Sequence, residues 1–120
     1  MKIGIDLLEI ARMEKSLRNP RFMARVFTPA EIELFAERRF AAQTVAANFC
    51  AKEAFAKALG CGFRGFSYLD IEVLRDPLGA PVLTAKGLAA ELLGDAKVSV
   101  SMTHTKGTAG AVVIIDISNK

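Results

Sequence analysis

Alternating and helically spaced apolar residues divide the chain into short strands and helices around one long apolar helix. Residues 2–7 alternate between apolar and polar side chains, as a half-buried strand does. Residues 9–17 and 21–27 have the spacing of amphipathic helices. Residues 40–60 are apolar nearly all the way round, which predicts a mostly buried helix that ends at Gly60.

A helix start signal and a series of turns predict the remaining elements. The segment Thr28-Pro29-Ala30-Glu31 combines a capping residue, a proline at the first helical position and the acidic residue of a capping box. The helix that it starts is expected to run to about Arg38. The other predicted elements are a strand at 68–75 that returns at 81–84, a helix at 85–93, an alternating strand at 98–103, a tight turn at 104–107 and an apolar strand at 109–117 that is buried on both faces.

The long helix carries only three charged residues, Lys52, Glu53 and Lys57. An ionised carboxylate on a mostly buried helix is costly unless a partner offsets its charge. Glu53 and Lys57 lie four residues apart and share a helix face, so Lys57 is one candidate partner and a metal ion is another. The helix pattern leaves a purely structural Glu53–Lys57 ion pair open beside a functional site.

Length and composition bound the architecture. A chain of 120 residues suits one domain, residues 1–120, with a hydrophobic core. The hydrophobic fraction of 52% is high for a small domain, which favours buried contacts between subunits. No apolar run approaches the length that spans a bilayer, and Met1 leads directly into a strand. We therefore expect a cytoplasmic protein that does not bind membranes.

The two cysteines, Cys50 and Cys61, are eleven residues apart. This spacing is not that of zinc ligands, and a disulfide is not expected in a cytosolic protein. We therefore expect two small, buried thiols.

The net charge of +3 is concentrated near the N-terminus. Residues 12–25 contain five cations against Glu14 alone, a local charge of +4, so the rest of the chain carries −1. A basic surface on a nearly neutral body indicates an acidic partner. Nucleic acid and an acidic protein both fit at this point.

Asp6 and His104 lie at the ends of predicted strands, where functional side chains are often placed. Asp6 fits either a cap for the following turn or a metal ligand. His104, the only histidine in the sequence, fits either a hydrogen-bonded structural residue or a functional one. Taken singly, neither residue is assigned by its pattern.

Three segments together carry a family resemblance: GIDLLEIARME near the start, FCAKEAFAKALG in the long helix and VSMTHTKGTAGAVV near the end. In this order, and over essentially the whole chain, the sequence resembles the holo-[acyl-carrier-protein] synthases, the small bacterial 4′-phosphopantetheinyl transferases. The resemblance implies an α+β fold with one long buried helix packed on a small, mainly antiparallel sheet. It also implies a homotrimer with active sites between subunits.

The activity that the resemblance implies is a Mg²⁺-dependent transfer of 4′-phosphopantetheine from coenzyme A to a serine of apo acyl carrier protein. The reaction releases adenosine 3′,5′-bisphosphate and serves fatty acid biosynthesis. By position, Asp6 and Glu53 match the magnesium ligands, and Lys57 matches a lysine near the phosphates. The implied coenzyme A site comprises Lys57, Gly79, Pro81, His104 and Thr105. The implied docking surface for the carrier protein comprises Arg12, Arg18, Arg21, Phe22 and Arg25.

One position departs from the family pattern. Members often read Arg-Phe-x-x-Lys-Glu-Ala, whereas Asn48 stands here in place of the arginine. If that arginine helps to hold coenzyme A, another cation must replace it. The candidates in the sequence are Arg39, Arg64 and Lys106.

Two other functions compete with the transferase. A small basic α+β module that binds nucleic acid would explain the charge cluster, but aromatic residues make up only 8% of the chain and none is Trp. A catalytically inactive oligomeric scaffold would explain Asn48, but the Asp6, Glu53, Lys57 and His104 set is intact. We therefore expect an enzyme that does not bind nucleic acid.

Overall fold

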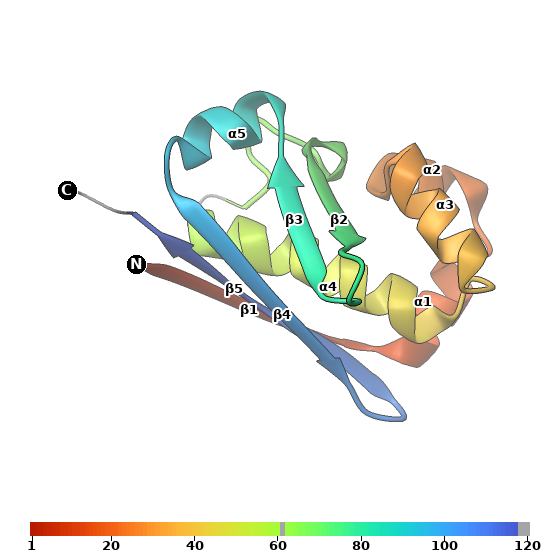
Figure 1. Ribbon diagram of the computed structural model, residues 1–120. Coiled ribbons are helices and arrows are strands. Elements are labelled where there is room, and N and C mark those ends of the chain that lie inside the picture. The colour runs from red at the N-terminus through yellow and green to blue at the C-terminus, as the bar shows by residue number, and fades with distance from the viewer. Residues whose placement is uncertain (61, 118–120) are drawn as a thin grey trace.

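The computed structural model describes residues 1–60 and 62–117, and Figure 1 shows their elements. The strands are β1 (Lys2–Glu9), β2 (Ile71–Arg75), β3 (Pro81–Ala85), β4 (Lys97–His104) and β5 (Thr108–Asp116). The helices are α1 (Ile10–Ser16), α2 (Pro20–Val26), α3 (Pro29–Glu37), α4 (Ala42–Leu59) and α5 (Gly87–Leu93), with a 3-10 turn, η1, at Tyr68–Asp70. This architecture confirms the expected α+β fold. None of the helices within the described ranges is long and apolar enough to cross a membrane.

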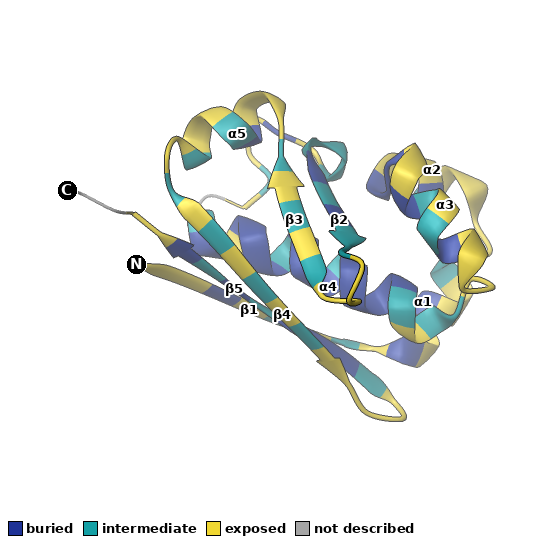
Figure 2. Ribbon diagram, viewed as in Figure 1, coloured by how far each residue is buried: buried dark blue, intermediate teal, exposed yellow. Residues whose placement is uncertain are grey.

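The long helix α4 packs on a three-stranded antiparallel sheet of order β1–β5–β4, while β2 and β3 form a separate hairpin beside the helix (Figure 1). Val45 and Phe55 of α4 and Val113 of β5 are fully buried, so the core lies between helix and sheet (Figure 2). Gly4 permits the close crossing of β1 and α4. A Cβ atom at Gly4 would lie 1.9 Å from the carbonyl oxygen of Ala54, so any side chain there would push the strand off the helix.

The two faces of the three-stranded sheet differ in burial. The outer face carries Ile3, Ile5 and Leu7, which are 60%, 61% and 68% exposed. Ile3 pairs with Ile114 and Ile5 pairs with Val112, both only half-buried on β5. The prediction that β5 is buried on both faces is therefore wrong for the single chain, because α4 covers only one face. An apolar strip, comprising these five residues, remains uncovered.

Local signals at helix ends are confirmed. The Thr28 hydroxyl accepts a hydrogen bond from the Glu31 backbone N–H at 3.2 Å, and Glu31 Oε1 accepts one from the Thr28 N–H at 2.9 Å. This is the predicted capping box of α3. Gly60 has φ of 86°, the left-handed conformation with which helices commonly end.

Residues 68–75 were predicted to form one strand, but the first three of them do not belong to a strand. Residues Tyr68–Asp70 form the η1 turn, and β2 begins at Ile71. Ser67 and Asp70 make a second capping box. The Ser67 hydroxyl accepts a hydrogen bond from the backbone of the turn, and the Asp70 carboxylate accepts one from the Ser67 N–H. This local hydrogen bonding outweighs the strand preference of the apolar residues.

A fully buried ion pair joins α3 to α4. Lys52 Nζ lies 2.6 Å from Glu31 Oε1, and neither side chain is exposed. The ammonium also donates to the carbonyl oxygens of Val26 and Tyr68, at 2.6 and 3.0 Å, and Glu31 accepts from the Val73 N–H at 2.8 Å. Burial raises the pKa of Glu31 and lowers that of Lys52, while their mutual attraction opposes both shifts. We call these groups the Lys52–Glu31 network.

Candidate active site

Asp6 and Lys57 form an ion pair where β1 crosses the C-terminal half of α4. Lys57 Nζ lies 3.0 Å from Asp6 Oδ1 and donates to the Ile5 carbonyl oxygen at 3.0 Å. The Asp6 side chain is 16% exposed, whereas that of Lys57 is 55% exposed. In the described part of the chain Asp6 accepts no hydrogen bond from a backbone N–H, so it does not cap the following turn.

Glu53 is held by a different partner from the one that the helix pattern offered. The Tyr68 hydroxyl donates a hydrogen bond to Glu53 Oε2 at 2.5 Å. The Tyr68 ring stacks on Phe49 with centroids 5.7 Å apart, which fixes the direction of the hydroxyl. Lys57 pairs with Asp6 instead, so the Glu53–Lys57 ion pair is not formed.

The Asp6 and Glu53 carboxylates both raise the pKa of the same two neighbouring side chains, Cys50 and Tyr68. The pKa of the Cys50 thiol is raised to about 12, first by burial and then by the negative charges of Asp6 and Glu53. The pKa of Tyr68 is raised by burial, by its hydrogen bond to Glu53 and by the same two charges. The crossing of β1 and α4 therefore brings both carboxylates into one neighbourhood. Cys50 is buried as expected, and the expectation for Cys61 lies outside the described residues.

This carboxylate pair suits a hard divalent cation. Mg²⁺ takes oxygen ligands and keeps several waters or substrate phosphate oxygens, so one or two protein carboxylates suffice. Within residues 1–60 and 62–117, no group of three or more His, Cys, Asp and Glu side chains could hold a metal ion. Two carboxylates, Asp6 and Glu53, match the small number of protein ligands that Mg²⁺ needs when water and substrate oxygens complete its coordination.

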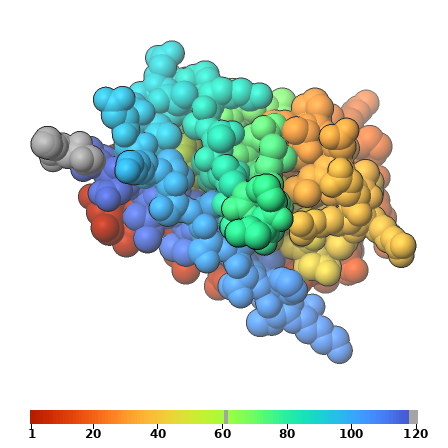
Figure 3. All heavy atoms as spheres, in the orientation of Figure 1, coloured from red at the N-terminus to blue at the C-terminus, as the bar shows by residue number. Residues whose placement is uncertain are grey.

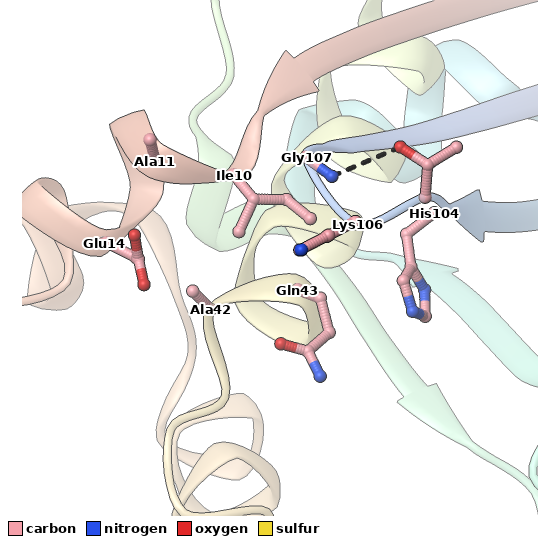
Figure 4. A pocket seen from close by; sticks show the side chains of 9 residues that line it. Ile10, Ala11, Glu14, Ala42, Gln43, His104, Lys106 and Gly107 are labelled. Atoms are coloured by element: carbon pink, nitrogen blue, oxygen red, sulfur yellow. Dashed lines mark hydrogen bonds between the residues drawn. The ribbon is translucent and has the colours of Figure 1, made fainter.

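His104 lies at the end of β4, over the N-terminal half of α4. It lines a cavity of about 410 Å³, and in Figure 4 its ring and the Gln43 side chain extend toward the same side of this cavity. It also lines an adjoining cavity of about 190 Å³ together with Gly79 and Pro81. Three of the residues implied for the coenzyme A site are therefore neighbours.

Thr105 belongs to the tight turn that was predicted at residues 104–107, and because β4 extends to His104 the turn follows that residue. Its hydroxyl accepts hydrogen bonds from the N–H groups of Gly107 and Thr108, at 3.3 and 3.1 Å. Thr105 lines the larger His104 cavity, so it joins the same group. The hairpin that it closes projects from the body of the molecule (Figure 3).

The carboxylate pair and the His104 cavities lie apart in a single chain. Gln43 and Glu53 are ten residues apart on α4, about 15 Å along the helix axis. Neither His104 cavity is lined by Asp6, Glu53 or Lys57. One chain therefore assembles the predicted catalytic residues as two halves, the carboxylate half and the histidine half.

Three of the residues predicted to dock the carrier protein gather around Phe49. Arg12 and Phe22 line a hollow with Phe49, and Phe22 and Arg25 line an apolar cavity of about 620 Å³ with Phe49 and Tyr68. The cavity thus adjoins the carboxylate half through Tyr68. The two other predicted residues are exposed and line neither hollow: Arg18 and Arg21.

Two residues at these sites were not predicted, Tyr68 and Arg75. Tyr68 follows Ser67, whose spacing to Asp70 is a capping signature that indicates a turn. Arg75 lies two residues after Val73 on β2, so strand alternation directs it to the same inner side. Both signals are present in the sequence but are short, and neither identifies a partner.

Comparisons with known proteins agree with these features. The profile of the 4′-phosphopantetheinyl transferase superfamily matches residues 2–113. The holo-[acyl-carrier-protein] synthase of Clostridium botulinum (strain Alaska E43 / Type E3) is 45% identical over 118 residues, which cover 96% of each chain. That of Syntrophus aciditrophicus (strain SB) is 50% identical over 119 residues, which cover 94% of this chain and 93% of the relative.

Solved structures share the fold. The Helicobacter pylori holo-[acyl-carrier-protein] synthase in complex with coenzyme A matches with a TM-score of 0.83 and 34% identity, over 95% of this chain and 99% of that one. The Bacillus anthracis str. Ames enzyme in complex with CoA (3′,5′-ADP) matches with a TM-score of 0.83 and 36% identity, over 98% and 96% of the two chains. Because sequence and fold agree over nearly the full length, the chain belongs to the 4′-phosphopantetheinyl transferase superfamily.

Proposed function

We propose that this protein is a Mg²⁺-dependent holo-[acyl-carrier-protein] synthase. It transfers 4′-phosphopantetheine from coenzyme A to a serine of apo acyl carrier protein and releases adenosine 3′,5′-bisphosphate. The observation that carries the proposal is the convergence of Asp6, Glu53 and Lys57 at the crossing of β1 and α4. The names of the full-length relatives support the same activity.

The reaction requires charge neutralisation and alignment more than a protein nucleophile. The serine hydroxyl attacks the β-phosphorus of the coenzyme A pyrophosphate, and the bond to the adenosine bisphosphate breaks. Asp6 and Glu53 would hold Mg²⁺, which when bound polarises the pyrophosphate and offsets charge on the leaving group. Lys57 is more than half exposed, so its ammonium can reach phosphate oxygens while remaining near Asp6.

The serine must lose a proton during the attack. A carboxylate acting through a water molecule is the first candidate for the base. Tyr68 occupies Oε2 of Glu53, which leaves Oε1 without a protein partner among the described residues. His104 belongs to the histidine half of the site, so we assign it to positioning. If His104→Ala changed the shape of the pH–rate profile by removing one limb, this assignment would be wrong.

The carrier protein is proposed to dock on α1 and α2. Acyl carrier proteins are acidic, so Arg12 and Arg25 would attract them, with Phe22 as the apolar anchor between these cations. Docking there would bring the serine toward Tyr68 and the carboxylate half of the site. Attraction of this kind weakens as salt increases, because exposed charges are screened.

The active protein is proposed to be a homotrimer with a shared site. The uncovered apolar strip on β1 and β5 would be buried by a second copy of the chain, and cyclic assembly buries it on every subunit. Contact between subunits would also bring the carboxylate half of one subunit to the histidine half of its neighbour. Light scattering should give three subunits for the wild type, and Ile5→Lys should give a monomer. A wild-type monomer would contradict the trimer.

The experiment that tests the function is a single assay. Apo acyl carrier protein and coenzyme A are incubated with the purified protein, with and without Mg²⁺, and the intact mass of the carrier is measured. We expect a gain of one phosphopantetheinyl group only when Mg²⁺ is present. An unmodified carrier under every condition would contradict the proposed activity.

A further inference from the structure

A small cationic cavity lies beside the histidine half of the site. It has a volume of about 190 Å³ and is lined by two arginines, Arg38 and Arg75, and by Thr44, Gly79 and His104 among others. The lining includes no Asp or Glu. In Figure 3 the turn between β2 and β3, in green, lies between β4, in blue, and the junction of α3 and α4, in yellow. The cavity therefore presents positive charge without a carboxylate to balance it.

Arg75 is held in this cavity by a buried amide. One guanidinium nitrogen of Arg75 donates to Asn48 Oδ1 at 2.8 Å, and the other donates to the Leu74 carbonyl oxygen at 3.2 Å. Asn48 is fully buried, and its Nδ2 donates to the Val73 carbonyl oxygen at 2.8 Å. Because this bond fixes which end of the amide carries nitrogen, the oxygen must face Arg75.

Arg75 makes no ion pair within the described part of the chain. Both of its hydrogen-bond acceptors are uncharged, and no carboxylate lies within ion-pair distance. Burial lowers its pKa and the nearby Arg38 lowers it further, while the negative charge of Glu31 opposes both effects. Two guanidinium groups that repel each other in a half-buried cavity are stabilised when an anion binds between them.

The N-terminus of α4 adds to the positive potential. Ala41 provides no side-chain cap, and the first turn contains no acidic residue. The same turn contributes Gln43 and Thr44 to the cavity, so the positive end of the helix dipole lies at its wall. The helix end and the two arginines thus favour the same kind of ligand, a compact anion.

We propose that Arg75 and Arg38 bind the 3′-phosphate of the coenzyme A ribose, and that Asn48 is the residue that positions Arg75. This inference rests on the proposed function. The pyrophosphate of coenzyme A is assigned to Lys57 and the carboxylate half, so the 3′-phosphate is the remaining anion. Asn48 replaces the arginine common in the family, and the cation beside it comes from β2 instead of from Arg39, Arg64 or Lys106.

The test compares binding of coenzyme A with binding of 3′-dephospho-coenzyme A by calorimetry, using the full chain without carrier protein. Arg75→Gln should weaken binding of coenzyme A by about 10- to 100-fold and change binding of the dephosphorylated form by less than about twofold. Lys97→Gln removes one exposed charge from the opposite end of β4 and should preserve the preference for coenzyme A. Equal weakening of both nucleotides by Arg75→Gln would overturn the inference.

Asn48→Ala tests the positioning role separately. It should lower the preference for coenzyme A over the dephosphorylated form, because Arg75 loses its orientation while its charge remains. A merely structural role would weaken both ligands alike, and that result would overturn the positioning assignment. Arg75→Gln decides on the phosphate site even if Asn48→Ala does not fold. If the wild type binds neither nucleotide, the proposed function itself fails, which distinguishes that failure from this one.

Discussion

Two lysines of α4, Lys52 and Lys57, each pair with a carboxylate, yet their surroundings are opposite. Lys52 and Glu31 are fully buried, and the ammonium donates to two carbonyl oxygens besides its carboxylate. Lys57 is 55% exposed and shares its ammonium between Asp6 and a single carbonyl oxygen. The two lysines are five positions apart in the sequence, which places them about 140° apart around the helix.

The difference shows how one helix serves both fold and chemistry. A buried charge must have its hydrogen bonds satisfied, so the Lys52–Glu31 network has no capacity left for a ligand. A half-exposed pair exchanges protein contacts for substrate contacts at little cost. Tyr68 joins the two regions, because its carbonyl oxygen accepts from Lys52 while its hydroxyl donates to Glu53.

The largest expected effect is on stability, from Lys52→Met. This change leaves Glu31 buried without its counter-ion, so the free energy of unfolding should fall by about 3–5 kcal/mol. Lys57→Met is the matched control and should cost less than about 1 kcal/mol, because that pair is partly solvated. Urea denaturation measures both. Equal losses of unfolding free energy in the two variants would contradict the proposed difference between the buried Lys52 pair and the exposed Lys57 pair.

The pH dependence of Lys52→Met sharpens the same point. Burial raises the folded-state pKa of Glu31 above its ordinary value of 4.5, and the variant lacks the lysine that opposes this shift. A carboxylate with a raised folded-state pKa contributes stability at low pH that is lost as pH rises. The deficit of the variant relative to wild type should therefore shrink as pH falls toward 4.5 and be smallest below pH 4.5 in denaturation curves. A deficit independent of pH would show that Glu31 is not the cause.

The next largest effect is on catalysis, from Glu53→Gln. Loss of one of the two proposed magnesium ligands should lower kcat/KM by about 100-fold or more, because metal binding contributes several kcal/mol to transition-state stabilisation. The melting temperature should change little, since Glu53 has no ion-pair partner in the described chain. A variant with wild-type activity would exclude Glu53 as a ligand.

A smaller effect is expected from Tyr68→Phe. Removing the hydroxyl frees Oε2 of Glu53 from its orienting donor, so the affinity for Mg²⁺ should fall about tenfold. The ring contact with Phe49 and the backbone acceptor for Lys52 both remain, so stability should be nearly unchanged. Titration with Mg²⁺ under saturating coenzyme A gives the affinity. An unchanged Mg²⁺ affinity would remove Tyr68 from the site.

The smallest expected effect concerns docking, from Arg12→Glu. The apparent KM for acyl carrier protein should rise several-fold, because attraction becomes repulsion at the α1 surface. The KM for coenzyme A should not change. Steady-state kinetics at two salt concentrations measures both, and the difference between variants should narrow at high salt. Equal changes in both constants would place Arg12 outside the docking surface.

Local chemistry made much of the fold predictable from the sequence. The capping box at Thr28 and the glycine at position 60 set helix ends, because each depends on neighbours in the chain. The outer face of β5 was not predictable in this way. The apolar pattern of β5 is the same whether its outer face is covered by the chain itself or by another copy of the chain, so the pattern cannot distinguish the two cases.

Prediction of the candidate site had the same limit, because it too depends on tertiary contacts. Asp6, Glu53 and Lys57 were singled out by their patterns and given roles by a resemblance, but their pairing depends on how β1 crosses α4, which no spacing encodes. The sequence offered Lys57 as the partner of Glu53, since the two share a helix face. In the fold, Asp6 accepts a hydrogen bond from Lys57, and the Tyr68 hydroxyl donates one to Glu53. Each of the two helix residues therefore has a partner from outside α4. Tertiary contacts thus replaced the local pairing.

The central claim, that Asp6 and Glu53 share one divalent cation, is tested most directly by crystallography with a metal that scatters anomalously. Crystals grown with coenzyme A and Mn²⁺ in place of Mg²⁺ should show one anomalous peak in contact with both carboxylates. In Glu53→Gln crystals that peak should weaken or vanish. A wild-type peak that contacts neither carboxylate, or no peak at saturating Mn²⁺, would contradict the account.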